Sequence, residues 1–188
     1  MRNKKLRIYL EGTLFATIAM VLSLIPTGIG SSFSVSLGMI PLTFYAIRRG
    51  LMPGLYAGFL WGLLHFVTGS VYMLNIYQVI IEYTLAYAFV GIAGFYSKEI
   101  LKNISLNNYK MVQFYILIAV FTGALGRYFW HFIAGWIFWG DYALWGLSAF
   151  LFSLVMNGLS MIVTALVTMV VMLMLYRNSR IIFLPKKK

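Results

Sequence analysis

The chain alternates between long apolar stretches and short polar ones. A helix needs about 20 mostly apolar residues to cross the hydrocarbon core of a bilayer, and several of the stretches have about that length. We place the apolar stretches at roughly 8–25, 36–47, 53–69, 75–96, 111–139 and 147–176. The second is the shortest and contains Pro41. The pattern predicts six transmembrane helices in a single domain covering residues 1–188, with short basic tails at 1–7 and 177–188.

The composition excludes a soluble protein. Of the 188 residues, 62% are hydrophobic and only 10% are charged, which is more apolar surface than a soluble domain of this size can bury. We therefore predict an all-α integral membrane protein.

Several kinds of chemistry lack the residues that they need. There is no cysteine, so disulfides and thiolate metal sites are excluded. Two histidines and four acidic residues leave little material for any other metal site. No phosphate-binding loop of the G-x-x-x-x-G-K type is present, so the chain does not hydrolyse ATP alone. No serine–histidine or paired-carboxylate pattern stands out either, and we expect no metal, no cofactor and no enzymatic activity.

The distribution of charge predicts the orientation in the membrane. The net charge is +11, and when the helices are threaded alternately, 14 of the 15 basic residues fall on one side. The loops on the other side, around 26–36, 68–75 and 140–146, contain no lysine or arginine. By the positive-inside rule both termini are cytoplasmic in a multi-pass plasma membrane protein. The basic excess thus faces membrane lipid, and we do not expect nucleic-acid binding.

Polar residues inside the apolar stretches mark a candidate site. Ionisable groups within membrane helices are costly, so they face the interior of the bundle or a cavity. Helical spacing puts polar residues on one face of each of the last three helices. These faces are Asn75, Gln78 and Glu82 in the fourth helix, Arg127, His131, Gly135 and Trp139 in the fifth, and Ser153, Asn157 and Ser160 in the sixth.

The depths of three of these residues agree. Counted from the outer ends of their helices at 1.5 Å per residue, Glu82 lies roughly 10 Å down, His131 roughly 12 Å and Asn157 roughly 15 Å. The segment 128–145 adds nine aromatic residues in 18 positions. Aromatic rings near a buried carboxylate suit a planar cation. The pattern therefore predicts a pocket that opens outward and binds a cationic, partly aromatic small molecule.

Each of these residues also fits a purely structural role. Aromatic residues form belts at membrane interfaces, and His131 or Asn157 could serve packing between helices. Arg127 could neutralise Glu82 in a structural ion pair. The outer loop 26–36 is rich in glycine and serine, which suits either a lid or an ordinary flexible loop.

Small residues in the first helix have the spacing of a helix contact. Gly12 and Ala16 are four residues apart, which permits close approach of another helix. Packing within the chain explains this spacing as well as a partner protein does.

Four segments carry a resemblance to a known family. They are IPLTFYAIRRGLMPGLYAGFLWGLLHFVTG (40–69), YQVIIEY (77–83), RYFWHFIAGWIFW (127–139) and SLVMNG (153–158). With the short helices around them, they resemble the thiamine-specific substrate-binding subunit (S component, ThiT family) of energy-coupling factor (ECF) transporters. The resemblance covers nearly the whole chain.

The resemblance implies a six-helix subunit that captures thiamine at the outer face with high affinity. Such a subunit cannot move thiamine alone and works with a transmembrane coupling subunit and two ATPase subunits. In that family, small residues on the first helix serve docking, which would give this role to Gly12 and Ala16.

The resemblance also implies roles for residues of the pocket. Glu82 would hydrogen-bond the aminopyrimidine and balance the thiazolium charge, while His131 and Trp139 would enclose the rings. The remaining contacts would come from Gly135, Tyr72, Tyr83 and Asn157. Two positions differ from the family pattern: Phe152 replaces a tyrosine, and Ser32 and Phe33 stand where a tryptophan is usual.

Two alternatives stay open at this point. One is an S component for another vitamin or for a thiamine precursor. The other is a proton-coupled carrier of a small cation, with Glu82 and His131 as the proton relay.

Overall fold

The computed structural model describes residues 2–29 and 33–185. Ser32 of the first outer loop and Lys186 to Lys188 of the C-terminal tail lie outside the described residues. The α-helices are α1 (Arg2–Ser23), α2 (Met39–Arg49), α3 (Leu51–Val67), α4 (Ile76–Val79), α5 (Ala86–Phe89), α6 (Ser97–Ser105), α7 (Tyr109–Phe138) and α8 (Ala149–Ser179). Two-residue strands β1 (Gly28–Ile29) and β2 (Phe33–Ser34) pair antiparallel in the first outer loop.

Segments α4 to α6 form one long rod. Between α4 and α5 the chain makes a π-helical segment, η1 (Ile80–Leu85), and between α5 and α6 a 3-10 segment, η2 (Val90–Tyr96). Short 3-10 turns also precede and follow α8, namely η3 (Gly140–Tyr142) and η4 (Arg180–Phe183). The fourth predicted helix, placed at 75–96, therefore continues as far as Ser105.

The predicted all-helical membrane fold is confirmed. In the described residues, four helical stretches are long and apolar enough to cross a membrane: Lys5–Ser23, Ile76–Ser105, Tyr109–Phe138 and Ala149–Phe183. Helix α3 is a shorter apolar helix of 17 residues. Helix α2 has only 11 residues, about 16 Å at 1.5 Å per residue, which is short of the ~30 Å hydrocarbon core.

Helix α2 is apolar because it belongs to the core. Residues Met39 and Pro41 to Ile47 are buried among the other helices. The six predicted apolar segments thus all form helices, but six complete crossings stay a prediction.

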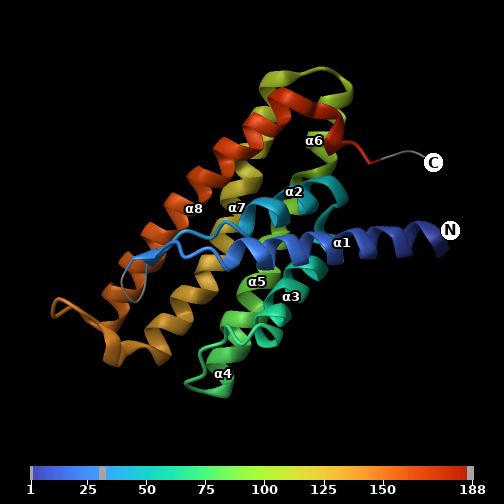
Figure 1. The fold of residues 1–188 in the computed structure, drawn as a ribbon. Helices are drawn as coiled ribbons and strands as arrows, with labels where there is room; N and C mark the ends of the chain where they lie inside the picture. The colour runs from blue at the N-terminus through green and yellow to red at the C-terminus, as the bar shows by residue number, and fades with distance from the viewer. Residues whose placement is uncertain (1, 30–32, 186–188) are drawn as a thin grey trace.

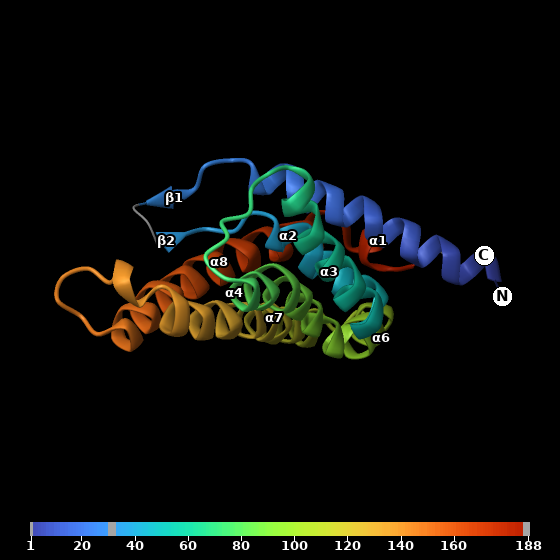
Figure 2. The ribbon, with the colours of Figure 1, turned by 90° about the horizontal axis from the view of Figure 1, so that it is seen from below.

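The two ends of the molecule are formed by different parts of the chain. Helices α7 and α8 run side by side, and α1 crosses the bundle from the end that holds the N-terminus (Figure 1). The two chain ends lie at the same end of the molecule, and β1, β2 and the loop before α8 lie at the opposite end (Figures 1 and 2). This arrangement agrees with the alternate threading deduced from the basic residues.

Glycines bring α3 against the rod formed by α4 to α6. Gly54, Gly58 and Gly62 follow one another at four-residue spacing on one face of α3. A Cβ atom at Gly62 would lie 1.7 Å from the carbonyl oxygen of Tyr83, and one at Gly58 would lie 2.4 Å from that of Tyr87. The two backbones are therefore in direct contact, which fixes the height of the π-helical segment that carries Glu82.

The small residues of α1 face inward. A Cβ atom at Gly12 would lie 2.8 Å from the hydroxyl oxygen of Tyr45 in α2, and Ala16 has no exposed surface. The same hydroxyl donates to the carbonyl oxygen of Ile8 at 2.6 Å. The packing of α1 on α2 therefore accounts for the spacing of Gly12 and Ala16, and a partner cannot reach them in this conformation. The exposed face of α1 carries large apolar residues such as Leu14.

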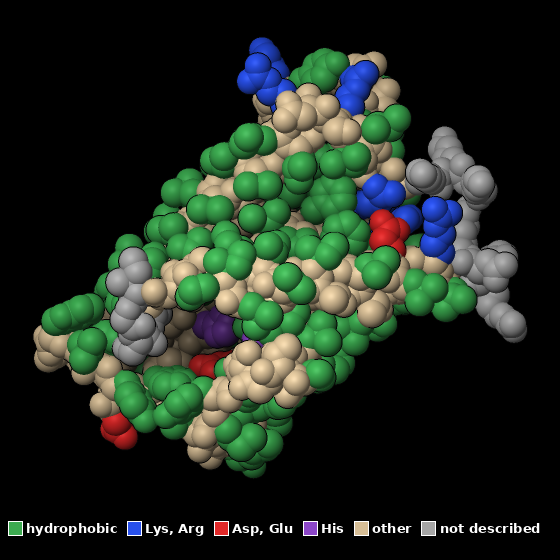
Figure 3. Space-filling view, in the orientation of Figure 1, with side chains coloured by type: hydrophobic (Ala, Val, Ile, Leu, Met, Phe, Trp, Pro, Cys, Tyr) green, Lys and Arg blue, Asp and Glu red, His purple; other side chains and the backbone are tan. Residues whose placement is uncertain are grey.

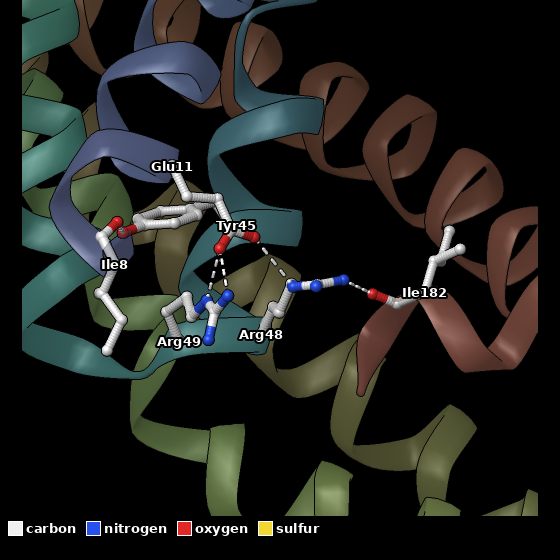
Figure 4. A network of polar contacts seen from close by, with 6 residues as sticks. All are labelled: Ile8, Glu11, Tyr45, Arg48, Arg49 and Ile182. Atoms are coloured by element: carbon white, nitrogen blue, oxygen red, sulfur yellow. Dashed lines mark hydrogen bonds and ion pairs between the residues drawn. The ribbon is translucent and has the colours of Figure 1, made fainter. Parts of the chain in front are cut away.

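An ionic cluster ties α1, α2 and η4 together. Glu11 of α1 pairs with Arg48, whose Nε lies 3.0 Å from Oε1, and with Arg49, whose Nε donates to Oε2 at 2.8 Å. Arg48 also donates to the carbonyl oxygen of Ile182 in η4 (Figure 4). Arg48 thus connects the C-terminal turn to α1 and α2.

Candidate functional site

A cavity of about 240 Å³ lies between the rod, α7, α8 and β2. Small-molecule pockets typically measure roughly 300–1,000 Å³, so this cavity suits a small ligand. Figure 3 shows the hollow from one side, with an acidic side chain and a histidine inside it. Its lining residues are Ser34, Glu82, Tyr87, Arg127, Tyr128, His131, Gly135, Trp139, Phe152, Ser153, Met156, Asn157 and Ser160.

The structure brings five of the predicted site residues into this one cavity: Glu82, His131, Gly135, Trp139 and Asn157. Residues of three separate helices thus lie at one level, as their counted depths predict. Their roles as ligand contacts stay a prediction.

Glu82 is held in a fixed orientation by two donors. The indole Nε1 of Trp139 donates to its Oε1 at 2.9 Å, and the Nε2 of Gln78 donates to its Oε2. Gln78 itself is fully buried, and its Oε1 accepts a hydrogen bond from the backbone N–H of Leu74 at 3.1 Å. A carboxylate offers about four lone-pair directions, so acceptor capacity remains for a ligand.

Arg127 does not neutralise Glu82. Among the described residues, no lysine or arginine lies within ion-pair distance of Glu82. The guanidinium of Arg127 instead lies over the rings of Tyr87 (4.5 Å), Trp61 (4.7 Å) and Tyr128 (5.5 Å). Three aromatic faces stabilise this buried cation, and the carboxylate stays available to a cation from outside.

Arg127 also joins the cavity wall to the segment after β2. It donates to the hydroxyl of Ser36 and, through Nε, to the Nε2 of His131 at 3.3 Å. Because the Nε2 of His131 accepts this bond, the proton of the neutral ring resides on Nδ1. His131 is therefore held as a neutral ring next to the cavity.

Asn157 of α8 and Gly135 of α7 both adjoin Ser153, which connects the two helices. The Nδ2 of Asn157 donates to the carbonyl oxygen and to the hydroxyl of Ser153, both at 3.1 Å. Ser153 in turn donates to the carbonyl oxygen of Phe132 at 2.8 Å. A Cβ atom at Gly135 would lie 2.4 Å from the Ser153 hydroxyl oxygen. The space beside Gly135 is thus filled by Ser153.

Tyr72 and Tyr83, two further predicted site residues, do not line the cavity. The Tyr72 ring lies 5.1 Å from that of Trp139, and the backbone N–H of Tyr72 donates to the hydroxyl of Tyr83 at 3.0 Å. Trp139 also contacts Tyr142, with ring centroids 5.3 Å apart. A hydrogen bond with Tyr72 raises the pKa of Tyr142. Trp139, Tyr72 and Tyr142 thus form a cluster of aromatic rings beside Glu82.

Strand β2 and the residues after it are attached to α8, which the sequence pattern does not predict. The backbone N–H of Ser34 donates to the hydroxyl of Ser160 at 3.2 Å, and that of Ser36 donates to Thr164 at 3.1 Å. The part of the first outer loop from residue 33 onward is thus fixed, and Ser34 contributes to the cavity wall.

Sequence reasoning also missed Tyr87. It stands five residues after Glu82, and on an ideal α-helix this spacing turns the two side chains about 140° apart. The π-helical segment at 80–85 has wider turns, with i to i+5 hydrogen bonds, and brings both side chains to the cavity. Tyr128 and Met156, by contrast, adjoin Arg127 and Asn157 directly in the sequence.

Comparisons with known proteins agree with the resemblance. A family model described as thiamine transporter protein matches residues 9–184. The thiamine transporter ThiT of Lacticaseibacillus paracasei is 35% identical over 190 residues, covering 98% of this chain and 94% of the relative. The thiamine transporter ThiT of Bacillus subtilis is 31% identical over 147 residues, covering 78% and 76% respectively.

A solved structure has the same fold. ThiT from Listeria monocytogenes superposes with a TM-score of 0.95 at 49% sequence identity, covering 97% of this chain and 100% of that chain. A family of transporters also agrees with the prediction that the chain is no enzyme. Its bacterial relatives and its apolar helices identify a multi-pass plasma membrane protein. With a family model over most of its length and relatives above 30% identity, the chain belongs to the thiamine transporter protein family.

Proposed function

We propose that this chain binds thiamine in the cavity beside Glu82 and is the substrate-capturing subunit of an ATP-driven importer. The observation that carries the proposal is the carboxylate of Glu82, which faces the cavity without an arginine or lysine partner among the described residues. A buried anion in this state favours a cationic ligand, because the cation replaces the solvation that the carboxylate has lost.

The groups around Glu82 suit the two rings of thiamine. Thiamine joins a thiazolium cation to an aminopyrimidine, so it offers a flat positive ring and an N–H donor. Trp139, on which Tyr72 packs, presents aromatic surface for the cation, and Glu82 has acceptor capacity for the amino group. Asn157 uses its Nδ2 within the protein, and its carbonyl oxygen accepts no hydrogen bond from the described part of the chain. That oxygen is a second acceptor for the pyrimidine.

Transport requires other subunits. The sequence has no phosphate-binding loop, so the energy of ATP must come from separate proteins. In this proposal they are the transmembrane coupling subunit and two ATPase subunits of an ECF transporter. The inward-facing Gly12 and Ala16 do not provide the docking surface unless α1 moves. The exposed apolar face of α1, which includes Leu10 and Leu14, remains available for it.

The proton-coupled carrier is not favoured. Its relay needs His131 free to take up a proton, and the Nε2 of His131 already accepts a hydrogen bond from Arg127.

Titration with the separate halves of thiamine distinguishes a thiamine precursor from thiamine as the ligand.

The direct test is equilibrium binding to the purified chain in detergent. Trp139 lines the cavity, so thiamine should quench tryptophan fluorescence on binding. We expect thiamine to bind at least about 100-fold more tightly than either its separate pyrimidine or its separate thiazolium half, because each half leaves part of the site unmatched. Absence of saturable quenching, or equal affinity for one half, would contradict the proposal.

A further inference from the structure

A second pocket lies at the opposite end of the molecule from the thiamine cavity, where α7 begins and α8 ends. It has a volume of about 300 Å³ and is lined by Tyr109, Gln113, Tyr176, Arg177, Asn178 and Arg180. We call it the basic pocket, because its charged lining residues are two arginines and no acid. It shares no residue with the thiamine cavity.

Arg180 is held in place by its neighbours. Its NH1 donates to the Oδ1 of Asn107 at 2.5 Å and to the hydroxyl of Tyr109 at 2.9 Å. Its guanidinium also lies over the Tyr109 ring at 5.7 Å. A guanidinium has five N–H donors, so Nε and NH2 remain for another acceptor, and neither donates to a protein acceptor within residues 2–29 and 33–185.

The turn that carries Arg180 is anchored on both sides. Arg48 donates to the carbonyl oxygen of Ile182, as Figure 4 shows. Phe183 has no exposed surface, and its ring packs on those of Phe44 at 5.0 Å and Tyr176 at 6.1 Å. The pocket is therefore preformed, and a ligand there meets a smaller entropic cost of ordering the protein.

The charge of the basic pocket is not neutralised within the described residues. Neither Arg177 nor Arg180 forms an ion pair there, and Glu11, an acid on the same side of the membrane, already pairs with Arg48 and Arg49. Two guanidinium groups with free donors match an anion that has several acceptor oxygens. Phosphate groups have this geometry and bind arginine through two parallel hydrogen bonds.

The surroundings indicate that the phosphate comes from a lipid. The basic excess predicts that this end faces the inner leaflet, and tyrosines such as Tyr109 and Tyr176 are typical of a membrane interface. Large apolar side chains next to the lining residues are exposed, among them Phe114 (52%) and Ile181 (72%). Basic pockets at cytoplasmic helix ends receive anionic lipid head groups. We propose that the basic pocket binds the phosphate group of an anionic phospholipid of the inner leaflet.

The experiment measures thermal unfolding of delipidated protein in a neutral detergent. We add phosphatidylglycerol, phosphatidylcholine or inorganic phosphate at equal concentration. Phosphatidylglycerol should raise the unfolding midpoint by about 3–6 °C when it is present well above its dissociation constant, and phosphatidylcholine should not. The variant Arg177→Gln should lose at least half of this shift. Arg177 forms no ion pair in the described part of the chain, so its replacement leaves the fold intact.

Two comparisons make the test specific. The double variant Arg177→Gln/Arg180→Gln should abolish the shift, and Arg7→Gln/Lys98→Gln should keep it, although it removes the same charge from exposed positions on the same side. An equal loss in both double variants would mean diffuse attraction to the basic surface and would overturn the proposal. Equal stabilisation by inorganic phosphate would show that free phosphate is the ligand and that the lipid source is wrong. Thiamine titration of the same variants should give unchanged affinity, which separates this proposal from the proposed function.

Discussion

Replacing Glu82 by glutamine tests the origin of ligand affinity, because it removes the charge and keeps the size of the side chain. Glutamine can still accept a hydrogen bond from Trp139 through its carbonyl oxygen. Its amide nitrogen then faces the Nε2 of Gln78, and two donors oppose each other. The Gln78 amide cannot rotate to separate the two donors. Its Oε1 accepts a hydrogen bond from the N–H of Leu74, and its Nε2 donates to the carbonyl oxygen of Tyr72 at 3.2 Å.

Two energy terms follow from this geometry. A unit cation about 4 Å from a carboxylate gains about 4 kcal/mol at an effective dielectric constant of 20, before desolvation of the ligand is subtracted. The unpaired buried donor costs about 1–3 kcal/mol. This cost is the same in the free and in the bound protein, so it lowers stability and cancels from the binding free energy. We therefore expect a net loss of binding free energy of at least about 2 kcal/mol, which is about 30-fold in Kd.

The assay is thiamine titration by tryptophan fluorescence, with Asp141→Asn as the matched control. Asp141 is an exposed carboxylate near the same end of α7 and does not line the cavity. Its replacement should change Kd less than about twofold, because solvent and salt screen its charge. A neutral thiamine analogue that lacks the ring charge should bind Glu82→Gln and the parent with similar affinity. If Glu82→Gln binds thiamine within twofold of the parent, the charge of Glu82 is not the source of affinity.

Further substitutions test the other contacts. Trp139→Phe keeps an aromatic face and removes the donor to Glu82, so we expect about tenfold weaker thiamine binding by the same titration; unchanged affinity would show that the indole N–H is dispensable. Gly135→Ala places a methyl group 2.4 Å from the Ser153 hydroxyl oxygen, which should cost about 1–3 kcal/mol and weaken binding by separating α7 from α8; a crystal structure with unmoved helices would refute this. Gly62→Ala should lower the thermal unfolding midpoint by several degrees, because its Cβ meets backbone that cannot retract; equal stability to the parent would contradict the packing of α3.

Periodicity and depth are sufficient to identify three residues that line the cavity. Glu82, His131 and Asn157 can be found because each stands inside an apolar stretch and each counts to nearly the same level from the outer end of its helix. Periodicity and depth both depend only on the geometry of a helix, which varies little between proteins. Both can therefore be predicted from the sequence alone.

What the sequence could not reveal are departures from regular helix and contacts between distant segments. The π-helical segment 80–85 brings Tyr87 beside Glu82, and no pattern in residues 76–95 marks its presence. Asn75, which shared a predicted polar stripe with Glu82, instead accepts a hydrogen bond from the N–H of Tyr77 and caps α4. The position of Arg127 over three aromatic rings depends on Trp61 of α3, which lies 66 residues away in the sequence. Helix α2 has the composition of a membrane crossing because a buried helix and a lipid-facing one are equally apolar.

The contact of Gly54, Gly58 and Gly62 with the rod of α4 to α6 has a mechanical consequence. Backbones that touch at three successive glycines resist sliding and rotation, because a shift drives one main chain into the other. The segment that carries Glu82 therefore keeps its position relative to α3. Because the rod and α3 keep their relative position, any opening of the cavity requires movement of this unit relative to α7, α8 or β2, the other elements that line it.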